Sequence, residues 1–468
     1  MGTGCAGGWT AAAVPLLMNG LASDLGGIIT VSEEEASWIT SLLNLGSLVG
    51  SLPAGQLSYQ FGRRKFLLYL GVLMIFAWLL IIYNFNNVGL IYLGRFICGF
   101  VAGAVCITLA MYTNEVCSDP IRGRSGCFYD MMQVFGILFV YIVTASFSLY
   151  WASNLCMLIP TIFLCTFYWM PESPLCLVKQ RRQLEAIDSI RWFHGEDCDV
   201  EKQLARINMA LLEGKENELY YNDEPSYYWT STLQFFRGLS KNTIRSFLLI
   251  LFLFIIQRSC GAPIVVYYTV DIFDAAHSSV SSTAATVYTG VAQLIFTSLS
   301  FSFIDTLGRR ILLIFSFGTM IASLLVFIVY IHFASLGNDL VASFGWIPVL
   351  SISVFVGIFR LGVGPIPWFM CAELIPTEAQ RWALPAILFT AWGVAFLCSK
   401  TYLAAVDIFG FTNVFTFFII VCSFGLLETI FLLPETKNKS RVQIQQDLGS
   451  EPSKLNTLIT KPVIIIEN

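Results

Sequence analysis

The chain has 468 residues, of which 56% are hydrophobic and 12% are charged, with a mean hydropathy of +0.70. Soluble globular chains are about 45–50% apolar and about 25% charged, so this composition excludes that class and indicates a protein embedded in a lipid bilayer. The net charge of −4 and the lack of a basic cluster give no support for a nucleic-acid partner, and the 13 cysteines lack the paired spacing of a metal or disulfide site.

Apolar runs follow one another along the whole chain. A bilayer core about 30 Å thick needs about 20 mostly apolar residues per helix. Eleven runs of that kind lie at 38–57, 66–84, 88–112, 127–148, 150–170, 244–268, 283–304, 311–333, 343–370, 383–405 and 412–434. The segment before them is weaker, because a helix from Gly2 to Leu17 would be about 24 Å long. We expect either a half-length first helix or an incomplete start of the chain, and we favour the second.

The charges of the loops alternate along the chain. Arginine and lysine lie in every second loop, at 62–65, 122–124, 308–310, 381 and 437–441, whereas the other loops are acidic or uncharged. Because basic loops remain in the cytoplasm, both termini are predicted there, together with the polar segment 175–243. That segment has helical periodicity at 183–193 and 199–214. The predicted domains are an N-terminal half at 1–174, a linker at 175–243, a C-terminal half at 244–436 and a tail at 437–468.

The two halves carry the same polar marks in the same order. "GRR" occurs at 62–64 and 308–310, a glutamate followed by an arginine comes next in each half, and "PES" at 171–173 corresponds to "PET" at 434–436. An internal repeat of this kind is typical of transporters built from two related halves. We predict a gating ion-pair network across the two halves, formed by Arg63, Arg64, Glu115, Arg122, Glu172, Arg309, Arg310, Glu373, Arg381 and Glu435.

Longer motifs accompany these marks: "GRFICGFVAG" (94–103), "PESPLCL" (171–177), "GPIPWFMCAELIP" (364–376) and "LPETKNK" (433–439). With them the chain resembles the sugar porter family of the major facilitators. "GWTAAAVPLL" (8–17) is most similar to the insect facilitated trehalose and glucose transporters. The resemblance implies an all-α major facilitator fold with two six-helix halves. It also implies a sugar substrate, the plasma membrane, a functional monomer, no cofactor and no metal.

The resemblance further implies a central site where polar side chains bind sugar hydroxyls and tryptophan stacks on the ring. The matching residues are Gln257, Gln293, Trp368, Trp392 and Tyr267. In "GPIPW", Pro365 and Pro367 each remove a backbone donor, which predicts a break in the tenth span.

Three charges depart from the family pattern. Arg258 replaces a glutamine of the seventh span, and Asp130 stands where many members have a cavity glutamine. Intramembrane charges are costly and usually face a cavity or a partner, so we expect Asp130 to pair with Arg258 beside the substrate. Arg360 either binds substrate charge or extends to the outer surface, and we favour the second.

The predicted function is facilitative transport of trehalose or a hexose by alternating access, without enzymatic activity. Thr10 follows the Gly-Trp pair where proton-coupled members carry an aspartate, which favours uniport. Two alternatives stay open. One is a proton-coupled carrier or a carrier of a small organic anion. The other is a sugar sensor or an inactive relative that transports nothing.

Overall fold

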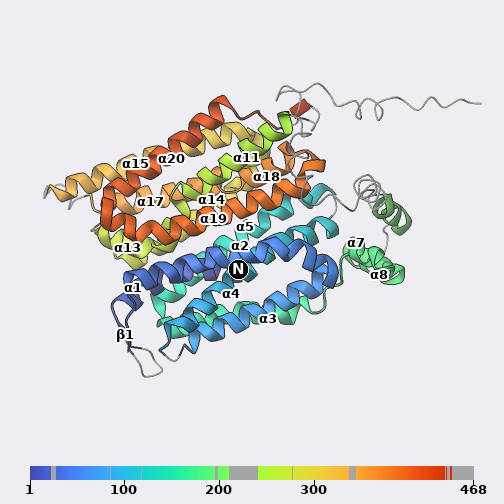
Figure 1. The fold of residues 1–468 in the computed structure, drawn as a ribbon, viewed down its shortest axis with the longest axis horizontal. Coiled ribbons are helices and arrows are strands. Elements are labelled where there is room, and N and C mark those ends of the chain that lie inside the picture. The colour runs from blue at the N-terminus through green and yellow to red at the C-terminus, as the bar shows by residue number, and fades with distance from the viewer. Residues whose placement is uncertain are drawn as a thin grey trace, which may run out of the picture.

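The computed structural model describes residues 1–22, 28–84, 86–117, 119–195, 199–209, 241–276, 278–336, 344–437, 439 and 443–444, without the side chains of 21–22, 28–29, 119–127, 305, 377–378 and 381. Its helices run side by side and gather into two groups (Figure 1). The first group contains α1 (Gly2–Met18), α2 (Glu33–Phe61), α3 (Arg63–Ile82), α4 (Val88–Val116), α5 (Asp119–Ser146) and α6 (Leu149–Phe167). A short antiparallel pair, β1 (Leu21–Ala22) with β2 (Ile28–Ile29), joins α1 to α2.

The second group has more segments because two of its spans are interrupted. It contains α11 (Lys241–Ser259), α12 (Ala262–Tyr267), α13 (Thr269–Ala275), α14 (Ser282–Leu307), α15 (Arg309–Ser335), α17 (Ile347–Ile358), η1 (Phe359–Val363), α18 (Ile366–Leu374), α19 (Thr377–Phe409) and α20 (Phe411–Phe431). Between the groups, α2 packs against α19 and α5 packs against α14. We call the end that carries the turns at 62–64 and 308–310 the basic end, and the opposite end the outer end.

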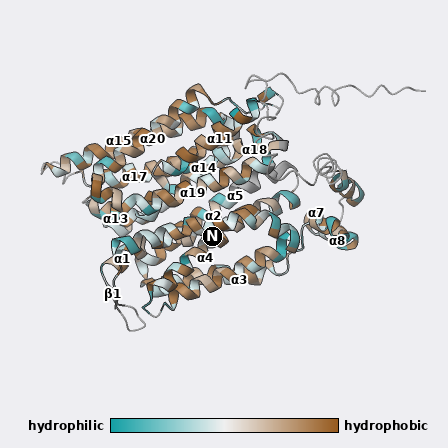
Figure 2. Cartoon of the chain, viewed as in Figure 1, coloured by the Kyte–Doolittle hydropathy of each residue, from teal (hydrophilic) through white to brown (hydrophobic). Residues whose placement is uncertain are grey.

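Ten helical segments of the described chain are long and apolar enough to cross a membrane. Apolar residues cover much of their length (Figure 2). They correspond to ten of the eleven predicted spans. The remaining one, 38–57, lies in α2, a helix of 29 residues that is too polar to qualify. Its first turn carries Glu33, Glu34 and Glu35, and a capping box with Ser32 starts the helix there.

Glycines allow α2 and α4 to approach closely. A Cβ on Gly46 would lie 2.1 Å from the Phe96 carbonyl oxygen, and one on Gly99 would lie 2.0 Å from the Leu43 carbonyl oxygen. Both distances are far inside van der Waals contact. Because no hydrophobic force draws helices together inside lipid, such close backbone packing supplies much of the attraction between them.

Two spans of the second group are broken near the middle. The seventh changes direction at Gly261, whose φ is +91° and whose Cβ would lie 2.4 Å from Cδ2 of Phe418. The tenth loosens into the π-helical turn η1, and α18 starts directly after Pro365. Both breaks leave backbone groups without helical partners, which makes them available to side chains or to a ligand.

The polar linker begins at the basic end. It contains α7 (Pro174–Lys179) and α8 (Gln183–His194), and residues 200–209 are helical. The helix predicted at 183–193 is therefore present, and the helix predicted at 199–214 is described as far as residue 209. Residues 210–240 lie outside the described part of the chain, as does most of the tail.

Candidate functional site: a cavity between the two helix groups

A cavity of about 1610 Å³ lies between the two groups. Its walls come from α1 to α6 on one side, and from α11, α12, α14, η1, α18 and α19 on the other. The lining reaches the basic end, since it includes Asn114 in the last turn of α4 and Gln380 in the first turn of α19. Ligand sites usually measure about 300–1000 Å³, so this cavity can hold a disaccharide together with water.

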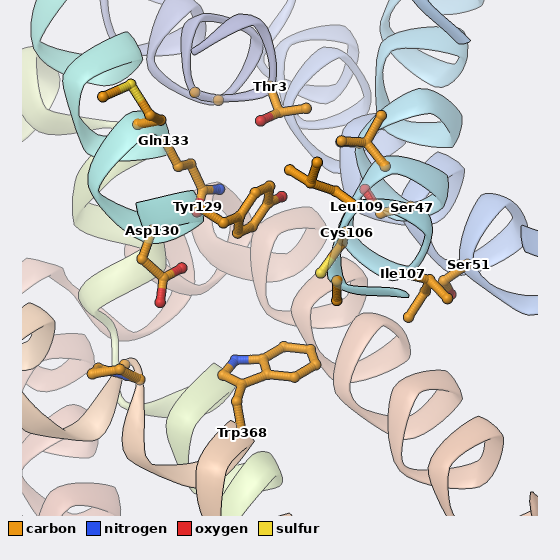
Figure 3. A pocket seen from close by; sticks show the side chains of 18 of the residues that line it. Thr3, Ser47, Ser51, Cys106, Ile107, Leu109, Tyr129, Asp130, Gln133 and Trp368 are labelled. Atoms are coloured by element: carbon orange, nitrogen blue, oxygen red, sulfur yellow. The ribbon is translucent and has the colours of Figure 1, made fainter. Parts of the chain in front are cut away.

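Six of the predicted substrate residues line this cavity: Asp130, Gln257, Arg258, Tyr267, Trp368 and Trp392. Figure 3 shows Asp130 pointing into it from α5, with Trp368 across the space. Trp368 packs edge-on against Phe254, with ring centroids 5.0 Å apart, and this contact holds the indole in place.

The sequence predicts that Gln293 lies in the substrate site, but the structure places it outside the cavity. Its side chain is fully buried outside the cavity lining, and neither polar atom of its amide has a hydrogen-bond partner among the described residues. Thr297 and Ser300, on the same face of α14 and nearer the basic end, line the cavity instead. On α14 the residues that line the cavity begin at Thr297, so the turn that carries Gln293 lies outside it in this conformation.

Gln257 connects the two broken spans. Its Nε2 donates to the carbonyl oxygens of Val363 at 3.0 Å and Gly364 at 2.6 Å. These carbonyls lie where the tenth span is interrupted, so the amide supplies donors that the helix no longer provides. Its Oε1 has no partner within the described structure and remains an acceptor next to the cavity.

The expected ion pair between Asp130 and Arg258 is not formed in the described structure. Instead, Cζ of Arg258 lies 4.5 Å from the centroid of the Trp392 ring. Asp130 lines the same cavity as both Arg258 and Arg360. Arg360 lines the cavity from η1, so the expectation that it extends to the outer surface is wrong. The π-helical turn places it in the middle of the span, where the cavity is the nearest polar space.

A polar face on α2 also borders the cavity and was not predicted from the sequence. Asn44, Ser47 and Ser51 all line the cavity. Their spacing of i, i+3 and i+7 places them on one side of the helix. That periodicity of polar residues within a span was the signal that would have identified them. On α5, Tyr129 and Gln133 also line the cavity beside Asp130 (Figure 3).

Contacts between the two groups close the outer end. The Asn44 amide donates to Ser399 Oγ at 3.0 Å and to the Ala395 carbonyl at 3.3 Å, and Asn44 Oδ1 accepts from the Tyr267 hydroxyl at 3.1 Å. Nearer the outer surface, Lys400 Nζ donates to Ser37 Oγ at 2.6 Å. The cavity is therefore shut at the outer end and reaches the basic end.

At the basic end, the two "GRR" turns form matching ion pairs. Arg63 pairs with Glu115 and Arg309 pairs with Glu373, each at 3.1 Å. Both pairs join elements of one group, so neither bridges the two groups as the sequence analysis predicted. The cavity reaches this end and separates the groups there. The predicted Arg122 and Arg381 side chains lie outside the described structure.

The glutamates of "PES" and "PET" have a second, repeated role. Glu172 accepts from the backbone N–H of Arg64 at 2.9 Å, and Glu435 accepts from the N–H groups of Arg309 and Arg310 at 3.1 Å. Each carboxylate thus caps the start of the helix after its "GRR" turn, where the helix dipole favours negative charge. The repeat read from the sequence is therefore a repeat of contacts as well.

A cavity between two groups of membrane-crossing helices, shut at one end, defines a multi-pass membrane transporter. Residues 4–448 match the Sugar (and other) transporter family, and the chain belongs to that family. Its fold is similar to the inward-open xylose transporter XylE from E. coli, with a TM-score of 0.74 at 20% identity over 96% of both chains. It is also similar to the proton:xylose symporter XylE bound to 6-bromo-6-deoxy-D-glucose, with a TM-score of 0.70 at 22% identity, covering 96% of this chain and 97% of that one.

The curated relatives are insect proteins. The chain is 30% identical over 465 residues to the facilitated trehalose transporter Tret1 of Bombyx mori, covering 99% of this chain and 87% of the relative. It is also 30% identical over 419 residues to Tret1 of Apis mellifera ligustica, covering 89% and 80%. The predicted family and major facilitator fold are confirmed, and the protein is a sugar transporter rather than an enzyme.

Proposed function

We propose that the protein is a facilitated carrier of trehalose or a hexose that works as a uniporter by alternating access. The observation that carries this proposal is the asymmetry of the central cavity. Inter-group hydrogen bonds shut its outer end, and about 1610 Å³ of space reaches the basic end. Rocking of residues 1–174 against residues 244–436 would reverse that asymmetry and expose the same side chains to the other side.

The substrate class is supported by the walls of the cavity. Trp368 and Trp392 provide flat apolar faces, and Gln257 and Gln133 provide amides for hydroxyl groups. Tryptophan faces and convergent polar groups together suit a molecule that is apolar on its ring faces and polar at its edges. Trehalose enters the proposal because the curated relatives are named as its transporters.

Uniport is supported by the position of Thr10. Its hydroxyl is fully buried and donates to the Gly7 carbonyl at 2.9 Å, so this turn of α1 offers no group that takes up a proton. By the charge rule, the basic end, the linker and both termini face the cytoplasm, and the plasma membrane is the proposed location. The cavity is built within one chain, which favours a functional monomer.

Uptake of labelled trehalose and glucose into oocytes tests this function, with the surface amount of protein measured on the same cells. Saturable uptake that is equal at pH 5.5 and 7.5 supports facilitated diffusion. Uptake that rises several-fold at pH 5.5 contradicts uniport. A protein that reaches the surface and moves neither sugar contradicts the proposed substrates.

A further inference from the structure

The cavity carries an unbalanced charge. Among its described lining residues the charged side chains are Asp130, Arg258 and Arg360, two cations against one anion. All three side chains line the same cavity, and we call them the charged cluster. Among these three side chains, one positive charge therefore remains without compensation.

Neither arginine has all of its guanidinium N–H donors bonded within the described part of the protein. Nε of Arg258 and Nε of Arg360 are buried, and neither has a hydrogen-bond partner within the described residues. No ion pair between Asp130 and either arginine is formed there. The Trp392 ring stabilises one face of Arg258, but a ring does not satisfy guanidinium N–H groups. Burying such donors without acceptors is costly unless a ligand supplies the acceptors.

Building on the proposed sugar transport, we propose that the cavity binds a sugar that carries a single carboxylate, with the carboxylate held between Arg258 and Arg360. One negative charge brings the cluster to neutrality. A planar carboxylate also matches the fork of guanidinium donors. A phosphate monoester, with nearly two negative charges, would overcompensate the cluster. The ring of the sugar acid would lie against Trp368 and Trp392, which line the same cavity.

The charge of the substrate gives the proposal an electrical readout. A uniporter that carries a singly charged anion moves one negative charge into the cell per cycle, which an electrode records as outward current. A neutral sugar carried by the same protein produces none. D-glucuronate is the probe, and glucose and trehalose are the neutral references.

Oocytes expressing the full chain would be tested for labelled uptake and for current. We expect saturable D-glucuronate uptake with about one elementary charge per molecule. Arg258→Gln and Arg360→Gln should each lower the ratio of glucuronate to glucose uptake by about 10- to 100-fold, because each removes charged hydrogen bonds to the carboxylate. Arg258→Lys, which keeps the charge, should retain part of the preference. Arg191→Gln is the matched control, because Arg191 lies exposed on α8.

Binding of labelled glucuronate to the detergent-purified protein separates this proposal from the transport function. Arg258-dependent binding without flux of any sugar would support the anion site and contradict the proposed transport. Saturable glucose or trehalose uptake without glucuronate uptake or current would overturn the anion site and leave the transport function intact. Absence of glucuronate binding, or a glucuronate preference that persists in both glutamine variants, would also overturn it.

Discussion

Asn44 is the side chain that most directly holds the two helix groups together at the outer end. It lies on α2, is 1% exposed, and exchanges hydrogen bonds with Tyr267, Ala395 and Ser399 of the other group. Opening the outer end requires α2 to separate from α19, so these bonds exist in only one of the two states. Asn44→Ala removes all of them without adding volume.

The expected magnitude follows from these contacts. Three hydrogen bonds at about 1 kcal/mol each amount to about 3 kcal/mol in favour of the closed outer end. This free energy corresponds to about a 100-fold change in the equilibrium between the two states. A protein with about 99% of molecules closed would therefore have about half of them open after Asn44→Ala.

Distances between spin labels on the two groups measure this equilibrium. Glu34 on α2 and Ile408 on α19 are exposed residues near the outer end and suit the labels. We expect one short distance in the parent protein and a second, longer population in Asn44→Ala. Asn114→Ala is the matched control, because Asn114 lines the cavity at the basic end and should leave the outer distances unchanged.

A distance distribution in Asn44→Ala that matches the parent protein would refute this role of Asn44. In that case apolar packing between α2 and α19, rather than the Asn44 amide, would keep the outer end shut. A longer population that also appears in Asn114→Ala would show that the amide has no specific role.

Three further changes have defined outcomes. Gly62→Ala should destabilise the protein by about 1–3 kcal/mol in thermal melting, because φ is +91° there and the new Cβ would lie 2.5 Å from Oε2 of Glu172. Trp368→Ala should raise the KM for sugar uptake about tenfold, and Trp368→Phe should raise it less. Burial, followed by nearby Asp274, raises the pKa of Asp271 in α13 to about 7. Folding stability should therefore fall as the pH rises from about 4 to 7, and Asp271→Asn should reduce that slope in melting curves measured across this range.

Much of the fold could be read from the sequence because its signals are local and repeated. Apolar runs of membrane length predicted ten spans that the structure contains. The paired "GRR" marks predicted the two turns whose glycines, Gly62 and Gly308, have nearly the same backbone angles. Such features depend on a few neighbouring residues, so they can be predicted without knowing how the helices pack.

The site was harder to predict, since its contacts depend on how the helices rotate and which end is closed. Arg258 contacts Trp392, a residue on another span far along the chain, and no spacing in the sequence indicates that pair. Gln293 lies on the same face of α14 as the lining residues Thr297 and Ser300, but it is buried nearer the outer end, outside the cavity. Acid and base were correctly recognised at the basic end. Which acid pairs with which base depends on how the helices pack, and both pairs lie within one group.

The location of the ion pairs within each group has a mechanical consequence. Arg63 is 8% exposed at its side chain, contacts both carboxylate oxygens of Glu115 and donates to Ser58 Oγ at 2.9 Å. If each group moves as a rigid body, these bonds persist in both states and do not bias the direction of transport. Breaking one partner of a buried pair costs about 3–5 kcal/mol of folding stability. Arg63→Gln should therefore lower the melting temperature but leave the outer label distances unchanged, the opposite of Asn44→Ala. A shift of those distances in Arg63→Gln would show that the pair also takes part in gating.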